Sequence, residues 1–135
     1  MGWLDRYKQQ PKDQTQLDLF GEGQALTPYH RVDGATVQQE LQSEVKQRGG
    51  TGKTHAQVNA IVTRNVLGCD PADLYAETGG VPNDRASLPE EAQSALIVGD
   101  VAARYQMQRD DAQGHKQILD SANKGSKTAR KLFPW

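Results

Sequence analysis

The segment that decides the fold is LPEEAQSALIVGDVAARYQMQR, residues 88–109. Ser87 stands just before this segment and Glu90 lies within it. They have the spacing of a capping box, in which two side chains accept hydrogen bonds from the free N–H groups at a helix start. Small or apolar residues then recur at helical spacing and form one face: Ala92, Ala95, Leu96, Gly99, Ala102 and Ala103. Because these side chains are short, another helix can approach this face closely.

Three larger apolar residues of the same segment, Val98, Val101 and Tyr105, widen the stripe. A helix that is apolar over most of its surface is typically surrounded by other helices. The sequence therefore predicts that residues 88–109 form the central helix of the fold.

Apolar periodicity and end signals predict four further helices, over residues 36–48, 54–67, 71–78 and 115–123. Thr36 and Thr54 are the expected caps of the first two, and Gly68 and Gly79 are expected to end the second and third. No segment shows the alternation of a β-strand. We therefore expect an all-α domain of four to five helices.

The composition places this domain within the chain. Of the 135 residues, 36% are hydrophobic and 6% are aromatic, against about 45–50% apolar residues in an ordinary domain. Residues 1–34 lack helical or strand periodicity and predict a flexible arm. The helical domain is expected over residues 35–123, followed by a basic and aromatic tail over 124–135.

Several classes of protein are excluded by what the sequence lacks. Its longest apolar run, residues 95–98, is far shorter than the ~20 residues of a membrane span, and no hydrophobic signal segment follows the N-terminus. Cys69 is the only cysteine, which predicts no internal disulfide and fits a reducing cytoplasm. The three histidines are scattered, so we expect no metal site and no cofactor.

Charge is unevenly distributed along the chain. Residues 68–111 carry three positive and nine negative side chains, whereas residues 112–135 carry five positive and one negative. The basic end predicts nucleic-acid contacts through Lys124, Lys127, Arg130, Lys131 and Trp135, because cations neutralise phosphates and aromatic rings stack on bases. The alternative is that Phe133 and Trp135 dock on the helical domain.

Residues 49–54, GGTGKT, end like a phosphate-binding loop. The full Walker pattern needs glycine where Gln47 stands, and its loop follows a buried strand, whereas a polar helix is expected here. We interpret the segment mainly as a turn between helices with a basic flank. The weaker alternative is that backbone N–H groups at the next helix start hold one nucleic-acid phosphate, with Arg48 and Lys53 as nucleic-acid contacts beside it. A nucleotide-binding protein remains a third and weaker hypothesis.

Gln16, Leu17, Asp18, Leu19 and Phe20 form a compact apolar motif within the expected arm. Leu19 and Phe20 are adjacent anchors for a hydrophobic pocket, Leu17 adds a contact, and Gln16 can bond to backbone at the pocket edge. The motif resembles the clamp-binding pentapeptide of bacterial replication and repair proteins, Gln-Leu-Ser/Asp-Leu-Phe. This resemblance implies the sliding clamp, the β subunit of DNA polymerase III, as a partner. The alternative is that the apolar residues fold back into a groove of the helical domain.

A second resemblance concerns layout. Residues 58–131 are similar to the C-terminal helical region of DNA-damage-inducible protein D and related phage antirepressor-type proteins. A helix ending at Gly68, a short helix closed by Gly79, a loop with Asp84 and a long helix with small residues follow in the same order. The N-terminal domain of that family is missing, and Ala86 and Ser87 stand where a polar pair is expected.

Together these patterns predict a non-enzymatic accessory or inhibitory factor of bacterial or phage DNA replication and repair. It would dock on the clamp and act through its helical body on DNA or on a repair or replication protein, in the cytoplasm at the nucleoid. The alternative is an antirepressor-type or damage-response DNA-binding regulator without clamp binding. The sequence leaves the oligomeric state open.

Overall fold

The computed structural model describes the backbone of residues 2–9 and 27–135, and the side chains of residues 2–9 and 35–135. The described part is all-α, as predicted, and contains no strand. Its elements are α1 (Trp3–Gln9), α3 (Thr27–Gln47), α4 (Gly52–Leu67), α5 (Pro71–Thr78), the 3₁₀ turn η2 (Arg85–Ser87), α6 (Glu90–Asp110) and α7 (Gly114–Arg130).

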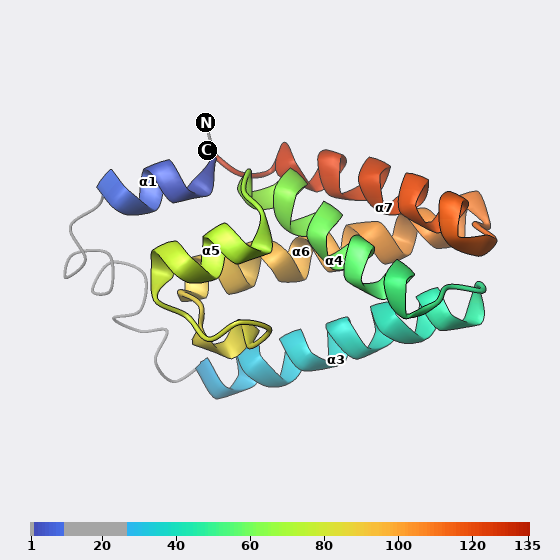
Figure 1. Ribbon diagram of the computed structural model, residues 1–135, viewed down its shortest axis with the longest axis horizontal. Helices are drawn as coiled ribbons and strands as arrows, with labels where there is room; N and C mark the ends of the chain where they lie inside the picture. Colours follow the sequence, from blue (N-terminus) through green and yellow to red (C-terminus); the bar gives the residue numbers. More distant parts are fainter. Residues whose placement is uncertain (1, 10–26) are drawn as a thin grey trace.

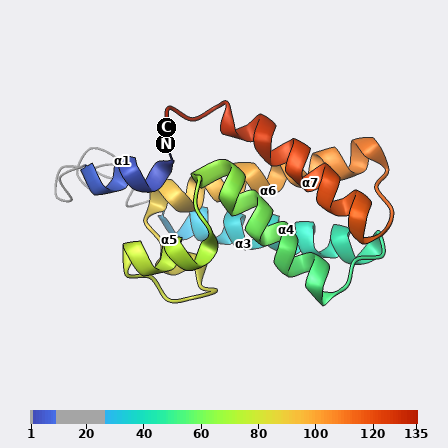
Figure 2. The same ribbon diagram turned by 45° about the horizontal axis from the view of Figure 1, so that its top comes forward.

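Four long helices, α3, α4, α6 and α7, form the body of the molecule, and α6 is in contact with each of the other three. Figure 1 shows α3 and α7 on opposite sides, with α4 and α6 between them. Helix α5 lies at the end of the body where the two chain termini meet (Figure 2). The prediction that α6 is the central helix is therefore confirmed.

Small residues on α6 allow two neighbouring helices to approach closely. A Cβ atom at Gly99 would lie 2.7 Å from Val62 Cγ1 of α4. At the crossing with α7, a Cβ atom at Gly125 would lie 2.4 Å from the Ala102 carbonyl oxygen. Since real Cβ atoms do not come so near to other atoms, only glycine permits these two crossings.

The helix ends differ from the expected ones. Helix α3 begins at Thr27 rather than 36, because a single glycine such as Gly34 costs only about 1 kcal/mol inside a helix. Helix α4 begins at Gly52, where the Thr51 N–H donates to Thr54 Oγ1 at 3.0 Å, so that Thr54 supports the cap instead of being it. Helix α7 continues to Arg130 instead of ending at 123.

The expected flexible arm includes a docked helix. In α1, Trp3 is 1% exposed, and its Nε1 donates to Glu91 of α6 at 2.7 Å. Its ring stacks on Tyr7 with a centroid distance of 5.0 Å. A buried tryptophan contributes a large apolar area, which holds α1 against the body and corrects the prediction for residues 2–9.

The C-terminal residues also dock on the body. Trp135 Nε1 donates to the Val66 carbonyl at 2.8 Å, and its ring stacks on Phe133 at 4.8 Å. The Arg6 guanidinium lies 5.9 Å from the Trp135 ring centroid. This confirms the docking alternative. The half-buried ring of Trp135 is engaged by Phe133 and Arg6, and its stacking on bases stays a prediction.

Candidate docking groove between α6 and α7

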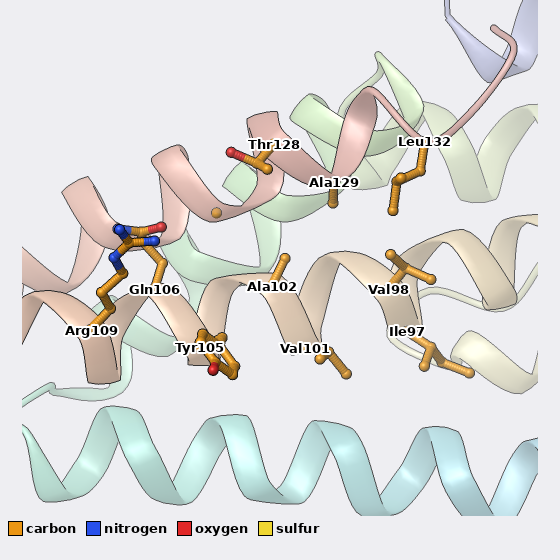
Figure 3. Close-up of a pocket in the computed structure, with 11 residues that line it drawn as sticks. Ile97, Val98, Val101, Ala102, Tyr105, Gln106, Arg109, Thr128, Ala129 and Leu132 are labelled. Carbon is orange, nitrogen blue, oxygen red and sulfur yellow. The ribbon is translucent and has the colours of Figure 1, made fainter.

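An open groove of about 490 Å³ runs between α6 and α7. Its walls are mainly apolar: Val98, Val101 and Tyr105 on α6, with Leu132 on the other side. Figure 3 shows Leu132 and Val98 facing each other across this space. The groove is thus an apolar surface that the described elements leave uncovered.

The floor of the groove follows from the close crossing of the two helices. Ala102, Gly125 and Ala129 carry little or no side chain, so nothing from the floor fills the space between the larger flanking residues. The residues that let α7 approach α6 therefore also create a depression beside the crossing.

Three large side chains of this surface are exposed, namely Val101 (48%), Tyr105 (68%) and Leu132 (74%). The prediction that Val101 and Tyr105 extend the core stripe is wrong. Each residue turns a helix by about 100°, so Val101 lies roughly 200° from the buried Ala103. The apolar pattern had found the right residues, but they form a second face of α6.

One cationic side chain, Arg109, lies in the lining of the groove, and two exposed lysines lie close to that lining in the chain. Lys124 and Lys131 are exposed on the turns either side of Thr128, which also lines the groove. Among the lining residues none is acidic.

The nearest acidic group on α6, Asp110, is already engaged. Its carboxylate accepts from Ser121 Oγ at 2.8 Å and from Gln106 Nε2 at 2.9 Å, and it lies 3.7 Å from Lys124 Nζ. The Ser121 hydrogen bond is the main reason why the pKa of Asp110 is lowered. This carboxylate therefore stays charged and offsets part of the Lys124 charge, while Arg109 remains the one charged residue of the lining.

The residues predicted to bind nucleic acid do not form one patch. Lys53 is exposed on the first turn of α4, while Lys131 is exposed beyond the end of α7, and Figure 1 shows these points at opposite ends of the body. Lys127 is exposed and Arg130 is half-buried on α7. The predicted residues that share one element are those on and just after α7, where Lys124, Lys127 and Lys131 are exposed.

Arg48, one of the predicted nucleic-acid contacts, is engaged in bonds within the fold. Its side chain is largely buried, with Nε donating to Glu44 at 2.8 Å and Nη1 donating to Asp111 at 3.1 Å and to the Ala112 carbonyl at 3.2 Å. The Arg48 carbonyl in turn accepts the Gly114 N–H at 2.8 Å. Arg48 thus ties the end of α3 to the turn between α6 and α7.

Residues 49–54 lack the setting of a nucleotide-binding loop. The segment links α3 to α4, whereas a phosphate-binding loop follows a buried strand. Thr54 is fully buried, with its Oγ1 2.7 Å from His115 Nδ1 of α7. The helix–helix turn is therefore the interpretation that fits the described structure.

A buried polar cluster that the sequence did not reveal joins α4, η2 and α6. Asp100 is fully buried and pairs with Arg85 Nη1, while Arg85 Nη2 donates to Asn59 Oδ1. Burial raises the pKa of Asp100, and the nearby Arg85 opposes that shift. Because the three residues are far apart in sequence and follow no motif, no pattern could have brought them together. We interpret the cluster as a tie that holds η2 on the body.

The described part also shows the surroundings of Cys69 and the character of its helices. Cys69 is half-buried, as expected, and burial raises the pKa of its thiol to about 11, so it is a poor nucleophile at neutral pH. Residues 2–9 and 27–135 contain no helix long and apolar enough to cross a bilayer. The motif at residues 16–20 lies outside the described residues.

Comparisons with known proteins give one informative similarity. No family model matches the chain. It is 30% identical over 89 residues to the DNA damage response protein C of Deinococcus radiodurans. The alignment covers 66% of this chain but only 38% of that protein, so the chain corresponds to less than half of its relative.

Proposed function

We propose that this protein is a non-enzymatic accessory factor of the bacterial DNA damage response, which docks on the sliding clamp through residues 16–20. Docking would bring the helical body to clamp-loaded DNA and raise its effective concentration there. The bound segment would also compete with other proteins that use the same clamp pocket.

The observation that carries this proposal is the full match of Gln16, Leu17, Asp18, Leu19 and Phe20 to the clamp-binding pentapeptide. Independent support for the damage response comes from the similarity to the D. radiodurans protein. The two observations concern the same process and rest on different properties of the chain.

The test is a titration of purified bacterial clamp with the protein, in which calorimetry measures the Kd. A short peptide that orders on binding has a Kd on the order of micromolar. The Leu19→Ala/Phe20→Ala variant removes both anchors, and we expect its affinity to fall by about tenfold or more. Val81→Ala, which trims an apolar side chain that is 58% exposed elsewhere, is the matched control and should bind normally.

Equal binding of the wild type and the Leu19→Ala/Phe20→Ala variant, or no binding by either, would contradict clamp docking. Primer extension by clamp-dependent polymerase then distinguishes the two consequences of docking. Inhibition that disappears in the double variant indicates exclusion of the polymerase, and unchanged synthesis indicates recruitment alone.

A second candidate function is DNA binding without the clamp. It is favoured by the exposed Lys124, Lys127 and Lys131 on and after α7. Because binding to phosphates releases counterions, the affinity for DNA should fall steeply with salt and with charge removal at these lysines. An affinity that does not change between low and high salt would contradict this function.

A further inference from the structure

We propose that the groove between α6 and α7 binds an acidic amphipathic helix of a partner protein. This inference goes beyond clamp docking and does not depend on it, because the groove and residues 16–20 are different parts of the chain. It rests on the shape of the groove, its apolar walls and its charged border.

The shape suits one short helix. The lining of α6 extends from Ile97 to Arg109, which at 1.5 Å per residue is about 18 Å, or roughly three helical turns. A helix lying in such a groove presents apolar anchors at i, i+3, i+4 and i+7. Val98 and Leu132, which face each other across the groove (Figure 3), would enclose one anchor, and Val101 and Tyr105 would pack beside the next.

The walls favour protein over nucleic acid. Val98, Val101 and Leu132 offer no hydrogen-bond donors to phosphates, while their apolar area is favourable for aliphatic and aromatic side chains. Tyr105 supplies one exposed ring with a polar tip, a combination that is common in protein interfaces.

The border determines the charge of the partner. Arg109 brings positive charge to the lining, which contains no acidic residue to oppose it, and Lys124 and Lys131 are exposed within four residues of Thr128 in the same lining. Asp110 offsets part of the Lys124 charge only. Acidic residues on the exposed side of the bound helix would therefore be attracted, and basic ones repelled.

The experiment uses fluorescein-labelled peptides of about 15 residues, roughly four helical turns. Three peptides carry leucine or phenylalanine at i, i+3, i+4 and i+7 in different orders, with glutamate on the opposite side. A fourth has lysine in place of glutamate. We expect at least one acidic peptide to bind the full-length protein with a Kd on the order of micromolar, and the lysine peptide to bind at least about tenfold more weakly.

Two variants test the walls and the border separately. Val101→Ser/Tyr105→Ser should raise the Kd of the acidic peptide by about tenfold or more, whereas Val81→Ser, at a similarly exposed site elsewhere, should leave it unchanged. Arg109→Glu/Lys131→Glu should weaken the acidic peptide and strengthen the lysine peptide. Circular dichroism confirms that each variant remains helical.

Several results would overturn the proposal. They are no binding by any acidic peptide, equal binding of the lysine peptide, and no effect of the wall variant. A dimer that Val101→Ser/Tyr105→Ser converts to monomer would identify a second copy as the occupant. Displacement of the probe by a peptide of residues 12–24 would identify the chain's own motif, and displacement by an oligonucleotide would identify nucleic acid. Apart from displacement by residues 12–24, none of these results bears on the clamp titration, so either proposal can fail while the other holds.

Discussion

Two neighbouring residues of α6 reverse the usual distribution of polarity. Asp100 carries a carboxylate and is fully buried, whereas the next residue, Val101, is aliphatic and 48% exposed. A step of about 100° along the helix separates them, so they belong to two faces with different surroundings. The inner face is closed by α3 and α4, and the outer face borders the groove.

The difference shows that burial in this protein is set by which partners a face has, and not by the polarity of the residue. Asp100 can be buried because Arg85 reaches it from η2 and is itself held by Asn59. Val101 is exposed because no described element of the chain covers that side of α6. One face is therefore complete within the described residues, and the other is left open for the partner proposed above.

The largest expected effect comes from breaking the inner face at Arg85. Arg85→Ala leaves the buried carboxylate of Asp100 without its cation, and losing one member of a buried ion pair typically costs about 3–5 kcal/mol. We expect the free energy of unfolding at pH 7, measured by urea denaturation, to fall by about that amount. A loss below about 1 kcal/mol would show that the buried carboxylate of Asp100 does not need the ion pair with Arg85.

The double variant Arg85→Ala/Asp100→Asn is the matched control for that prediction. It removes the charge that Arg85 balances, so we expect it to recover a large part of the lost stability, although the buried amide that replaces the carboxylate would still have few hydrogen-bond partners. If the double variant is as unstable as Arg85→Ala alone, the loss arises from packing of the arginine stem and not from its charge.

The same variant should change the dependence of stability on pH. Burial raises the pKa of Asp100 above its usual 3.8, and Arg85 opposes the shift, so removing Arg85 raises this pKa further. At pH values between the pKa of Asp100 in the unfolded chain and its higher pKa in the folded protein, the folded state binds a proton that the unfolded state does not. The free energy of unfolding therefore falls as pH rises through this range. The deficit of Arg85→Ala relative to wild type should shrink on acidification towards pH 4.

That pH effect is measured by urea denaturation of the two proteins at matched pH values. The Arg85→Ala/Asp100→Asn variant has no carboxyl at this position, so its deficit relative to wild type should vary much less with pH. A deficit of Arg85→Ala that stays constant from pH 7 to pH 4 would mean that Asp100 is neutral, or well solvated, throughout.

An intermediate effect is expected at the boundary between the two faces. Gly125→Ala places a methyl group 2.4 Å from the Ala102 carbonyl oxygen, and since backbone cannot swing aside, α7 must move away from α6. Overpacking of this kind costs about 1–3 kcal/mol, more than the gain of up to about 1 kcal/mol from helix propensity. Gly52→Ala, where a Cβ atom meets nothing within 4 Å, is the control and should not destabilise.

The fold was largely predictable because apolar periodicity and glycine spacing are local signals. They identified the central helix and the all-α class, and Gly68 ends α4 as expected. The docking of Trp3 and the Arg85–Asp100 pair depend on residues distant in sequence, which no local pattern connects. The groove was only half predictable, since Val101 and Tyr105 were recognised as a stripe but their exposure depends on where α7 lies.

The smallest effect is expected on the outer face itself. Val101→Ser/Tyr105→Ser changes two exposed side chains, and surface substitutions of this kind usually stay within about 0.5 kcal/mol each, so the urea midpoint should barely move. Leu96→Ala, on the inner face of the same helix and 1% exposed, should lose about 2–5 kcal/mol by comparison. If the outer variant instead lost more than about 2 kcal/mol, and the loss grew with protein concentration, the face would already be packed in solution. A small loss that does not depend on protein concentration would show that this apolar surface has no role in folding. The free energy gained by burying it is then available for binding a partner.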